Sequence, residues 1–207
     1  MASPLSRSLR NSIRSQVAKD RQLISQGHQI IQQQFNIVHK KFISEFESHP
    51  VTRELKGGSG SSNITGSLPQ GNLFGFIGFD RGEDPIKNLE KLLSNIEIIT
   101  KRRQMGKSGF IWTYIITAPS SRDIYAATPM PWATGSSWLQ ELESRGIPNL
   151  GQYMHKTINS SRSGAGFQNT SRPEGGRVRI SYVKELLSKF ETNLNSIDAS
   201  RVSKSYF

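Results

Sequence analysis

The chain contains no cysteine. It can therefore form no disulfide, offer no thiolate nucleophile and build no thiolate metal site. It also lacks an apolar run long enough for a transmembrane helix, and its first thirty residues lack the apolar centre of a signal peptide. We therefore expect a soluble protein that is made in the cytoplasm and has no membrane partner.

Hydrophobic residues are also scarce, at 34% of 207 residues. A chain of this length can bury the core of one domain plus an appendage. So low an apolar content predicts that part of the chain is exposed, extended or completed by a partner. The net charge of +11, from 27 basic and 16 acidic residues, indicates either an acidic partner, most commonly nucleic acid, or a charge that serves solubility.

Patterns that would indicate catalysis or cofactor binding are absent as well. The four histidines, at positions 28, 39, 49 and 155, stand apart and share no metal-binding spacing. The segment Gly106-Lys107-Ser108 has Lys101 where a phosphate loop needs glycine, and a strand rather than a helix is predicted after it. We expect no cofactor, no metal and no catalytic residues, and hence a protein that is not an enzyme.

The stretch Leu68–Pro85 is predicted to be the centre of the core. Five large apolar side chains occupy the seven positions Leu73–Phe79, interrupted only by Gly75 and Gly78. The glycines favour a curved or bulged strand. Asp84 followed by Pro85 is typical of a helix start. A helix is expected next, with its apolar face formed by Ile86, Leu89, Leu92 and Leu93.

Apolar residues recur at helical spacing from Leu5 to Phe46, which predicts a long N-terminal helix that ends before Pro50 and has one weak point at Gly27. Its first half is basic with a narrow apolar face, so it is either a solvated helix or a docking arm. Its second half carries the aromatic residues and is expected to dock on the core. The candidate docking residues are Ile31, Phe35, Val38 and Phe42.

A β-hairpin is predicted from Ile96–Gln104 and Phe110–Ala118, joined by the glycine-containing loop Met105–Gly109. Both faces of the second strand carry apolar or β-branched residues. The pattern therefore predicts a central strand with both faces covered and with Trp112 and Tyr114 in the core.

The remaining segments are assigned from turn residues and periodicity. We expect a turn at Val51–Leu55, a flexible loop at Lys56–Ser62, a short strand at Arg122–Thr128, a helix from the capping box at Ser137 to Gly146, a helix at Pro148–Met154, a long surface loop at Asn159–Gly176, a strand at Arg177–Tyr182 and a helix from Leu186 to Ile197.

Together these segments predict an α+β fold, a small curved antiparallel β-sheet packed by helices with a long N-terminal helix. The expected organisation is a helical arm at 1–48, a linker loop at 49–67, the core at 68–200 and a tail at 201–207.

Two basic clusters are candidate interface or anion-facing patches, although such clusters are also common on solvated surfaces. They comprise Lys101, Arg102, Arg103 and Lys107, and Arg162, Arg172, Arg177 and Arg179. The interleaved aromatic residues of a single-strand binder are missing, so any DNA contact is expected to be with the phosphate backbone and non-specific.

Four segments resemble a family of tailed-bacteriophage virion proteins, the small neck or tail-completion proteins. They are HPVTREL (49–55), NITGSLPQGNLFGFIGFDRGEDPI (63–86), PMPWATGSSWLQELESRGIPNLGQYM (129–154) and SRSGAGFQ (161–168). The resemblance implies a non-enzymatic, ring-forming virion protein that is made in the host cytoplasm and contacts itself and other neck, connector or tail-tube proteins.

The rival hypothesis from the residues themselves is a basic nucleic-acid-binding protein. Salt distinguishes the two, because phosphate binding weakens steeply with ionic strength whereas assembly through apolar helix faces does not.

Overall fold

A computed structural model gives the fold. The structure describes residues 12, 16, 20–68, 71–106, 109–131, 133–145, 154–155, 167–168 and 180–197. The chain divides into two compact units, the first formed by Met1–Lys40, Glu97–Thr117 and Glu191–Phe207, and the second by Lys41–Ile96 and Ala118–Phe190. Helices and antiparallel strands are mixed along the chain, which confirms the predicted α+β class.

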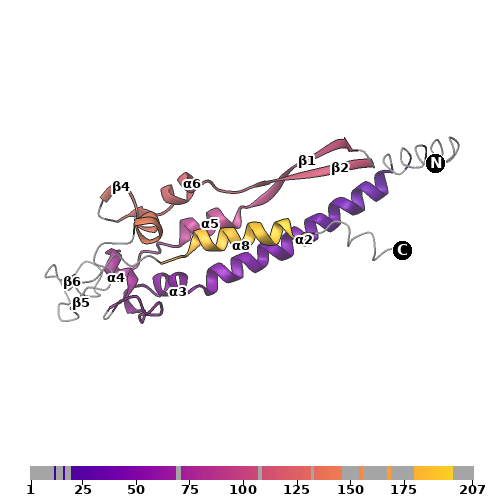
Figure 1. Ribbon diagram of the computed structural model, residues 1–207. Helices are drawn as coiled ribbons and strands as arrows, with labels where there is room; N and C mark the ends of the chain where they lie inside the picture. The colour runs from indigo at the N-terminus through magenta and orange to yellow at the C-terminus, as the bar shows by residue number, and fades with distance from the viewer. Residues whose placement is uncertain are drawn as a thin grey trace. The chain divides into compact units, whose positions relative to one another are not determined.

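The longest element is helix α2, Arg21–Ser48 (Figure 1). Its first turn is capped by Asp20, whose Oδ1 accepts hydrogen bonds from the amides of Gln22 at 2.9 Å and Leu23 at 3.3 Å. The helix continues through Gly27, where the sequence indicated a weak point. It ends at Ser48, two residues before a proline, as predicted.

In the first unit, strands β1 (Glu97–Gly106) and β2 (Gly109–Thr117) form a two-stranded antiparallel ribbon, which confirms the predicted hairpin (Figure 1). The register shifts at Ile99, where β1 has one extra residue.

The prediction of a central strand covered on both faces is wrong. Among the described residues, β2 pairs only with β1. Trp112 and Tyr114 on one face are half-buried, whereas Thr113 and Ile115 on the other are exposed. A strand with a single neighbour has too little surrounding structure to cover both of its faces.

In the second unit, the end of α2 is followed by α3 (Pro50–Lys56), which replaces the predicted turn, and then by the short 3₁₀ helix η1 (Gly58–Gly60). Pro50 at the first helical position and the side chain of His49 at the N-cap account for this start.

The apolar cluster Leu73–Phe79 is buried, as predicted, but forms helix α4 (Leu73–Ile77) and not a strand. Asn72 caps its start by accepting a hydrogen bond from the amide of Gly75 at 2.9 Å. Gly78 ends the helix in the left-handed conformation at φ 92°, which favours glycine. Gly78, predicted to bend a strand, therefore terminates a helix.

Helix α5 (Lys87–Ser94) follows, as predicted. Asp84 Oδ1 accepts from the amides of Ile86 at 3.0 Å and Lys87 at 3.2 Å, which is the capping role expected from the sequence. Ile86, Leu89 and Leu93 are fully buried.

Local capping also corrects a second strand prediction. The segment Arg122–Thr128 mostly lies in helix α6 (Ser121–Ala126), because Ser120 and Asp123 form a reciprocal capping box at its start. Strand β3 (Pro129–Met130) pairs with β4 (Ala133–Ser137). Ser137 then caps α7 (Trp138–Gln140), as predicted, and the chain continues as the π-helical turn η2 (Glu141–Arg145).

The last described helix, α8 (Val183–Asn195), confirms the predicted C-terminal helix. Met154–His155 forms strand β5, paired with β6 (Phe167–Gln168), so Met154 is not helical. Residues 180–182 form no strand, in contrast to the prediction for Arg177–Tyr182. The structure does not describe the remaining predicted segments, namely 148–153, 159–176 apart from Phe167–Gln168, 177–179 and 201–207. The predicted stop at Gly146 also lies outside the described residues.

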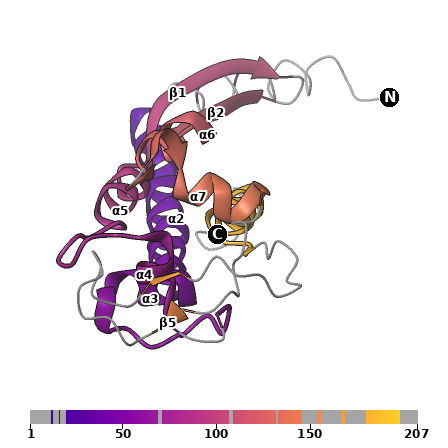
Figure 2. The same cartoon turned by 90° about the vertical axis from the view of Figure 1, so that its left-hand side faces the viewer.

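Aromatic pairs join the elements of the second unit. Phe42 of α2 stacks on Phe190 of α8 with ring centroids 4.7 Å apart, and Phe46 stacks on Tyr182 at 5.9 Å. Figure 2 shows α7 beside α8, where the chain around residue 143 meets the start of α8. Trp138 is almost completely buried, with its ring edge-on to Phe79 at 6.2 Å.

Trp112 and Trp138 therefore differ in what they contribute to stability. Trp138→Ala should lower the free energy of unfolding by roughly 3–5 kcal/mol, as truncation of a buried aromatic residue does. Trp112→Ala should cost less, since Trp112 is only half-buried. Urea denaturation followed by far-UV circular dichroism measures both. Equal losses would contradict the assignment of Trp112 to a half-covered ribbon face.

Candidate functional site

A buried carboxylate organises the loop between α3 and α4. Glu54 is fully buried, and its two oxygens accept hydrogen bonds from the amides of Leu73 at 2.6 Å and Thr65 at 2.7 Å. The carboxylate therefore ties two points of the loop to α3. Charge-assisted bonds to backbone amides are the strong kind that a buried carboxylate requires.

Asn72 holds the same loop through hydrogen bonds from its side chain. Its side-chain amide donates to the carbonyls of Ser61 at 2.8 Å, Gly58 at 3.2 Å and Ser59 at 3.3 Å, while its oxygen caps α4. The segment expected to be a flexible loop at Lys56–Ser62 is thus held by hydrogen bonds.

A second buried group lies between α3 and α8. The hydroxyls of Thr52 and Tyr182 are 2.5 Å apart, and both residues are fully buried. Burial raises the pKa of Tyr182 far above its usual value. The ring of His49 lies 4.7 Å from that of Tyr182, and its Nδ1 accepts the amide of Val51 at 3.3 Å.

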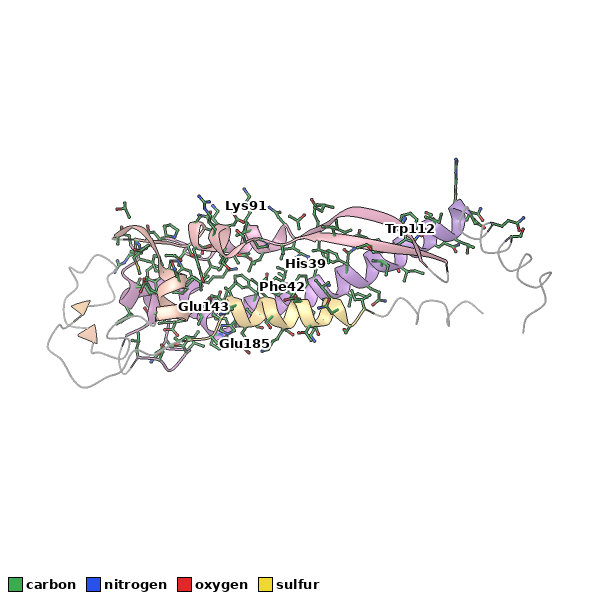
Figure 3. All side chains as sticks on the ribbon, turned by 45° about the horizontal axis from the view of Figure 1, so that its top comes forward. His39, Phe42, Lys91, Trp112, Glu143 and Glu185 are labelled. Atoms are coloured by element: carbon green, nitrogen blue, oxygen red, sulfur yellow. The ribbon has the colours of Figure 1, made fainter. Side chains whose placement is uncertain are left out.

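The side chain of Glu143, from η2, lies at the start of α8 (Figure 3), where its Oε1 accepts a hydrogen bond from the amide of Lys184 at 2.9 Å. Burial raises the pKa of Glu143, and hydrogen bonds from the backbone of residues 184, 182 and 183 oppose that rise. A carboxylate in this position satisfies the free amides of a helix N-terminus. All three polar side chains, those of Glu54, Asn72 and Glu143, are therefore hydrogen-bonded to backbone groups of their own chain.

No group of three or more His, Asp or Glu side chains in the described part of the chain could hold a metal ion. Within the same residues, no helix has the length and apolar character needed to cross a membrane.

The first unit presents a different kind of surface, where α2 contacts the ribbon. His28 of α2 lies 2.7 Å from the hydroxyl of Tyr114, and its ring is edge-on to Trp112 with centroids 4.5 Å apart. Burial raises the pKa of Tyr114. One face of the ribbon is thus held against the helix by a histidine and two aromatic residues.

The predicted docking residues of α2 lie on its covered side. Phe35 is buried and stacks on His39 with centroids 5.6 Å apart, and Phe42 is buried in the second unit. Ile31 and Val38 are half-buried. His28 was missed as a contact residue, although it precedes Phe35 by seven positions and so shares its helix face.

The predicted basic clusters are only partly described. Lys101, Arg102 and Arg103 lie in β1, where they pair in register with Tyr114, Thr113 and Trp112. The other five residues, Lys107, Arg162, Arg172, Arg177 and Arg179, lie outside the described part of the chain.

Part of the chain was expected to be exposed or completed by a partner, but no individual exposed apolar side chain was predicted. The large exposed ones in the described residues all belong to the first unit, with Leu23 49% and Ile37 61% exposed on α2, and Ile99 58% and Ile115 40% exposed on the ribbon. Two sequence signals pointed to them, namely the seven-residue spacing of Leu23, Ile30 and Ile37 and the second apolar face of β2.

Compared with protein-family models, curated proteins and solved structures, the chain shows no match.

The buried carboxylate of Glu54 can be tested directly. Glu54→Ala should lower the free energy of unfolding by about 3 kcal/mol, because the buried amide of Leu73 and the half-buried amide of Thr65 lose their acceptor. Glu54→Gln keeps one acceptor oxygen and should cost less. Urea denaturation of both variants measures the difference, and a neutral Glu54→Ala would contradict the role of this carboxylate.

His49 should make stability depend on pH. Burial lowers its pKa in the folded chain, Glu185 raises it and Lys189 lowers it further. As the pH falls through 6.5, the ordinary value, the unfolded chain therefore takes up the proton first. Stability should be greatest above that pH and should decrease as the pH drops toward the lower folded pKa.

The control is His49→Asn, which retains a capping oxygen but does not titrate. Urea denaturation of both proteins at several pH values should show a steeper loss of stability in acid for the native chain. Parallel pH profiles would contradict the role of His49.

Proposed function

We propose that this protein is a non-enzymatic structural component of a tailed-phage virion, acting at the head-to-tail neck or the tail terminus as a homo-oligomeric ring. The observation that carries the proposal is the exposure of apolar side chains on both elements of the helix–ribbon unit. Surfaces of this kind are typical of parts completed by neighbouring subunits. The resemblance of the four sequence segments to neck and tail-completion proteins supports the same role.

The polar groups of the second unit agree with an assembly role. Glu54, Asn72 and Glu143 hold backbone amides or carbonyls of their own chain. Their hydrogen bonds explain their burial without a substrate, so the proposal assigns them to folding.

The alternative is a basic nucleic-acid-binding protein that contacts phosphate. It is favoured by the net charge of +11 and by the run Lys101–Arg103 in β1. Binding of the full chain to duplex DNA over a series of salt concentrations tests it. A steep, log-linear loss of affinity with salt would support phosphate contact, whereas assembly into particles that resists salt supports the neck role.

The neck role is tested in particles. Removing residues 1–19 leaves Asp20 to cap α2, so the remaining chain should melt at nearly the same temperature. The proposal takes the removed segment as a docking arm rather than a solvated helix, so incorporation into particles should be lost. Western blotting of purified virions measures incorporation. Particles that lack the protein but still join full heads to normal tails would contradict the proposal.

A further inference from the structure

The charge of the ribbon in the first unit is confined to one of its two strands. Every charged residue of the strands lies in β1, namely Glu97, Lys101, Arg102 and Arg103. Arg103 pairs in register with Trp112, on the face that contacts α2. Arg102 pairs with Thr113, on the opposite face. Both faces of the ribbon therefore include charged positions, and its uncharged part is the outer edge of β2.

The outer edge of β2 is without a partner strand in the described part of the chain. There β2 pairs with β1 alone, and no backbone hydrogen bond joins it to another element (Figure 1). An antiparallel strand directs the N–H and C=O groups of alternate residues toward its neighbour and those of the others away from it. The residues of β2 that face away from β1 thus offer a row of backbone donors and acceptors to a further strand.

The two edges of the ribbon differ in their protection against pairing. Natural edge strands are blocked by charged side chains, by proline or by a β-bulge. β1 has three consecutive basic residues, Lys101–Arg103, and an extra residue at Ile99. The nine residues of β2, GFIWTYIIT, include no charge and no proline, and they are rich in β-branched and aromatic residues. The edge of β2 is therefore suited to strand pairing, whereas that of β1 is blocked.

We propose that β2 pairs edge to edge with β2 of a second copy, antiparallel and about a two-fold axis. The product is one four-stranded sheet in the order β1–β2–β2–β1. A two-stranded ribbon alone is marginal in water, and a sheet of three or more strands is stable more readily. Trp112 and Tyr114 of the two copies then become cross-strand neighbours on one face, and aromatic pairs of this kind stabilise a sheet.

Charge selects a second copy as the occupant of this edge. Strands in a sheet lie about 4.8 Å apart, so pairing through β2 keeps the two basic β1 strands about 14 Å apart. That distance exceeds the Debye length of about 8 Å at physiological ionic strength. Pairing through β1 would bring the same cations to one strand spacing, which is unfavourable in a chain of net charge +11. An acidic partner strand would find cations along β1 and none along β2.

Helix α2 is compatible with the four-stranded sheet. It contacts side chains of β2 on one face of the ribbon, through His28. A helix with its side chains is about 10 Å across, and two strands together are also about 10 Å wide. The two α2 helices of the dimer therefore fit side by side on the same face of four strands.

The test uses the full chain and a matched pair of substitutions, Ile115→Lys in β2 and Ile99→Lys in β1. Both replace an isoleucine that is exposed, 40% at Ile115 and 58% at Ile99, so both variants should fold. Ile115→Lys adds a cation where the two copies meet and should weaken self-association at least about tenfold, which is ~1.4 kcal/mol. Ile99→Lys adds the same charge to the far strand and should associate like the native chain. Sedimentation velocity measures association, and circular dichroism checks folding.

Hydrogen exchange distinguishes edge pairing from packing of two ribbons face to face. Edge pairing forms new backbone hydrogen bonds, so alternate amides of β2 should exchange at least about tenfold more slowly in the associated state than in the dilute chain. The amides of β1 should not change. Exchange detected by NMR resolves single amides. The measurement uses the native chain, so it does not depend on the folding of either variant.

Several results would overturn the proposal. A native chain that does not self-associate would do so, as would an Ile115→Lys variant that associates as well as Ile99→Lys. An associated state in which the β2 amides stay unprotected would indicate another contact. Protection of β1 amides together with those of β2 would indicate head-to-tail pairing of β2 on β1, which is also incompatible with the proposal.

The inference does not rest on the proposed function. The contact is two-fold and closes after two copies, so it does not by itself form the proposed ring. Protection of the β2 edge in a chain that is absent from virions would support the pairing and contradict the neck role. A chain that is present in virions but shows no protection of β2 on association would support the neck role and contradict the pairing.

Discussion

A two-stranded ribbon has two faces, and one helix covers only one of them. In the first unit, α2 takes the face with Trp112 and Tyr114, through His28. In β2, however, both faces of the strand carry apolar or β-branched residues. The exposed side chain of Ile115 is the direct result of this mismatch.

The second unit shows how a chain with few apolar residues still builds a closed core. The loop between α3 and α4 has little apolar surface, and hydrogen bonds from Glu54 and Asn72 hold it instead. Glu143 does the same for the start of α8. Buried polar groups replace part of the hydrophobic packing here, which is possible because each of them has backbone partners.

The proposed role follows from how charge and apolar surface are divided along the chain. Three of the four large exposed apolar side chains in the described residues, Leu23, Ile37 and Ile115, lie in the uncharged segments 22–39 and β2, and the fourth, Ile99, lies in β1. The basic run Lys101–Arg103 lies in the other strand of the ribbon. Because Arg102 pairs with Thr113, a basic residue lies on the same ribbon face as the exposed Ile115. The salt dependence of binding therefore separates the two hypotheses.

Periodicity and turn residues were sufficient to predict the elements whose signals are local. The end of α2 before Pro50, the β1–β2 hairpin, the Asp84 cap and α8 all follow from residues close in sequence. The cluster Leu73–Phe79 was misread because burial is equally compatible with helix and strand, and the caps Asn72 and Gly78 were given too little weight. Similarly, α6 is a helix because of the Ser120–Asp123 capping box, despite its β-compatible composition.

The sequence by itself determined the α+β class, the buried status of the central cluster and the absence of thiol chemistry, because each depends on composition or short-range pattern. Only the tertiary structure decided that Glu54 is a buried acceptor, that His28 meets Tyr114 across 86 positions, and that Leu23, Ile37, Ile99 and Ile115 remain exposed. These facts depend on which distant segments come together. The continuous run of apolar and β-branched residues in β2 predicts that both faces are shielded from water, but the tertiary structure determines which face its own chain covers.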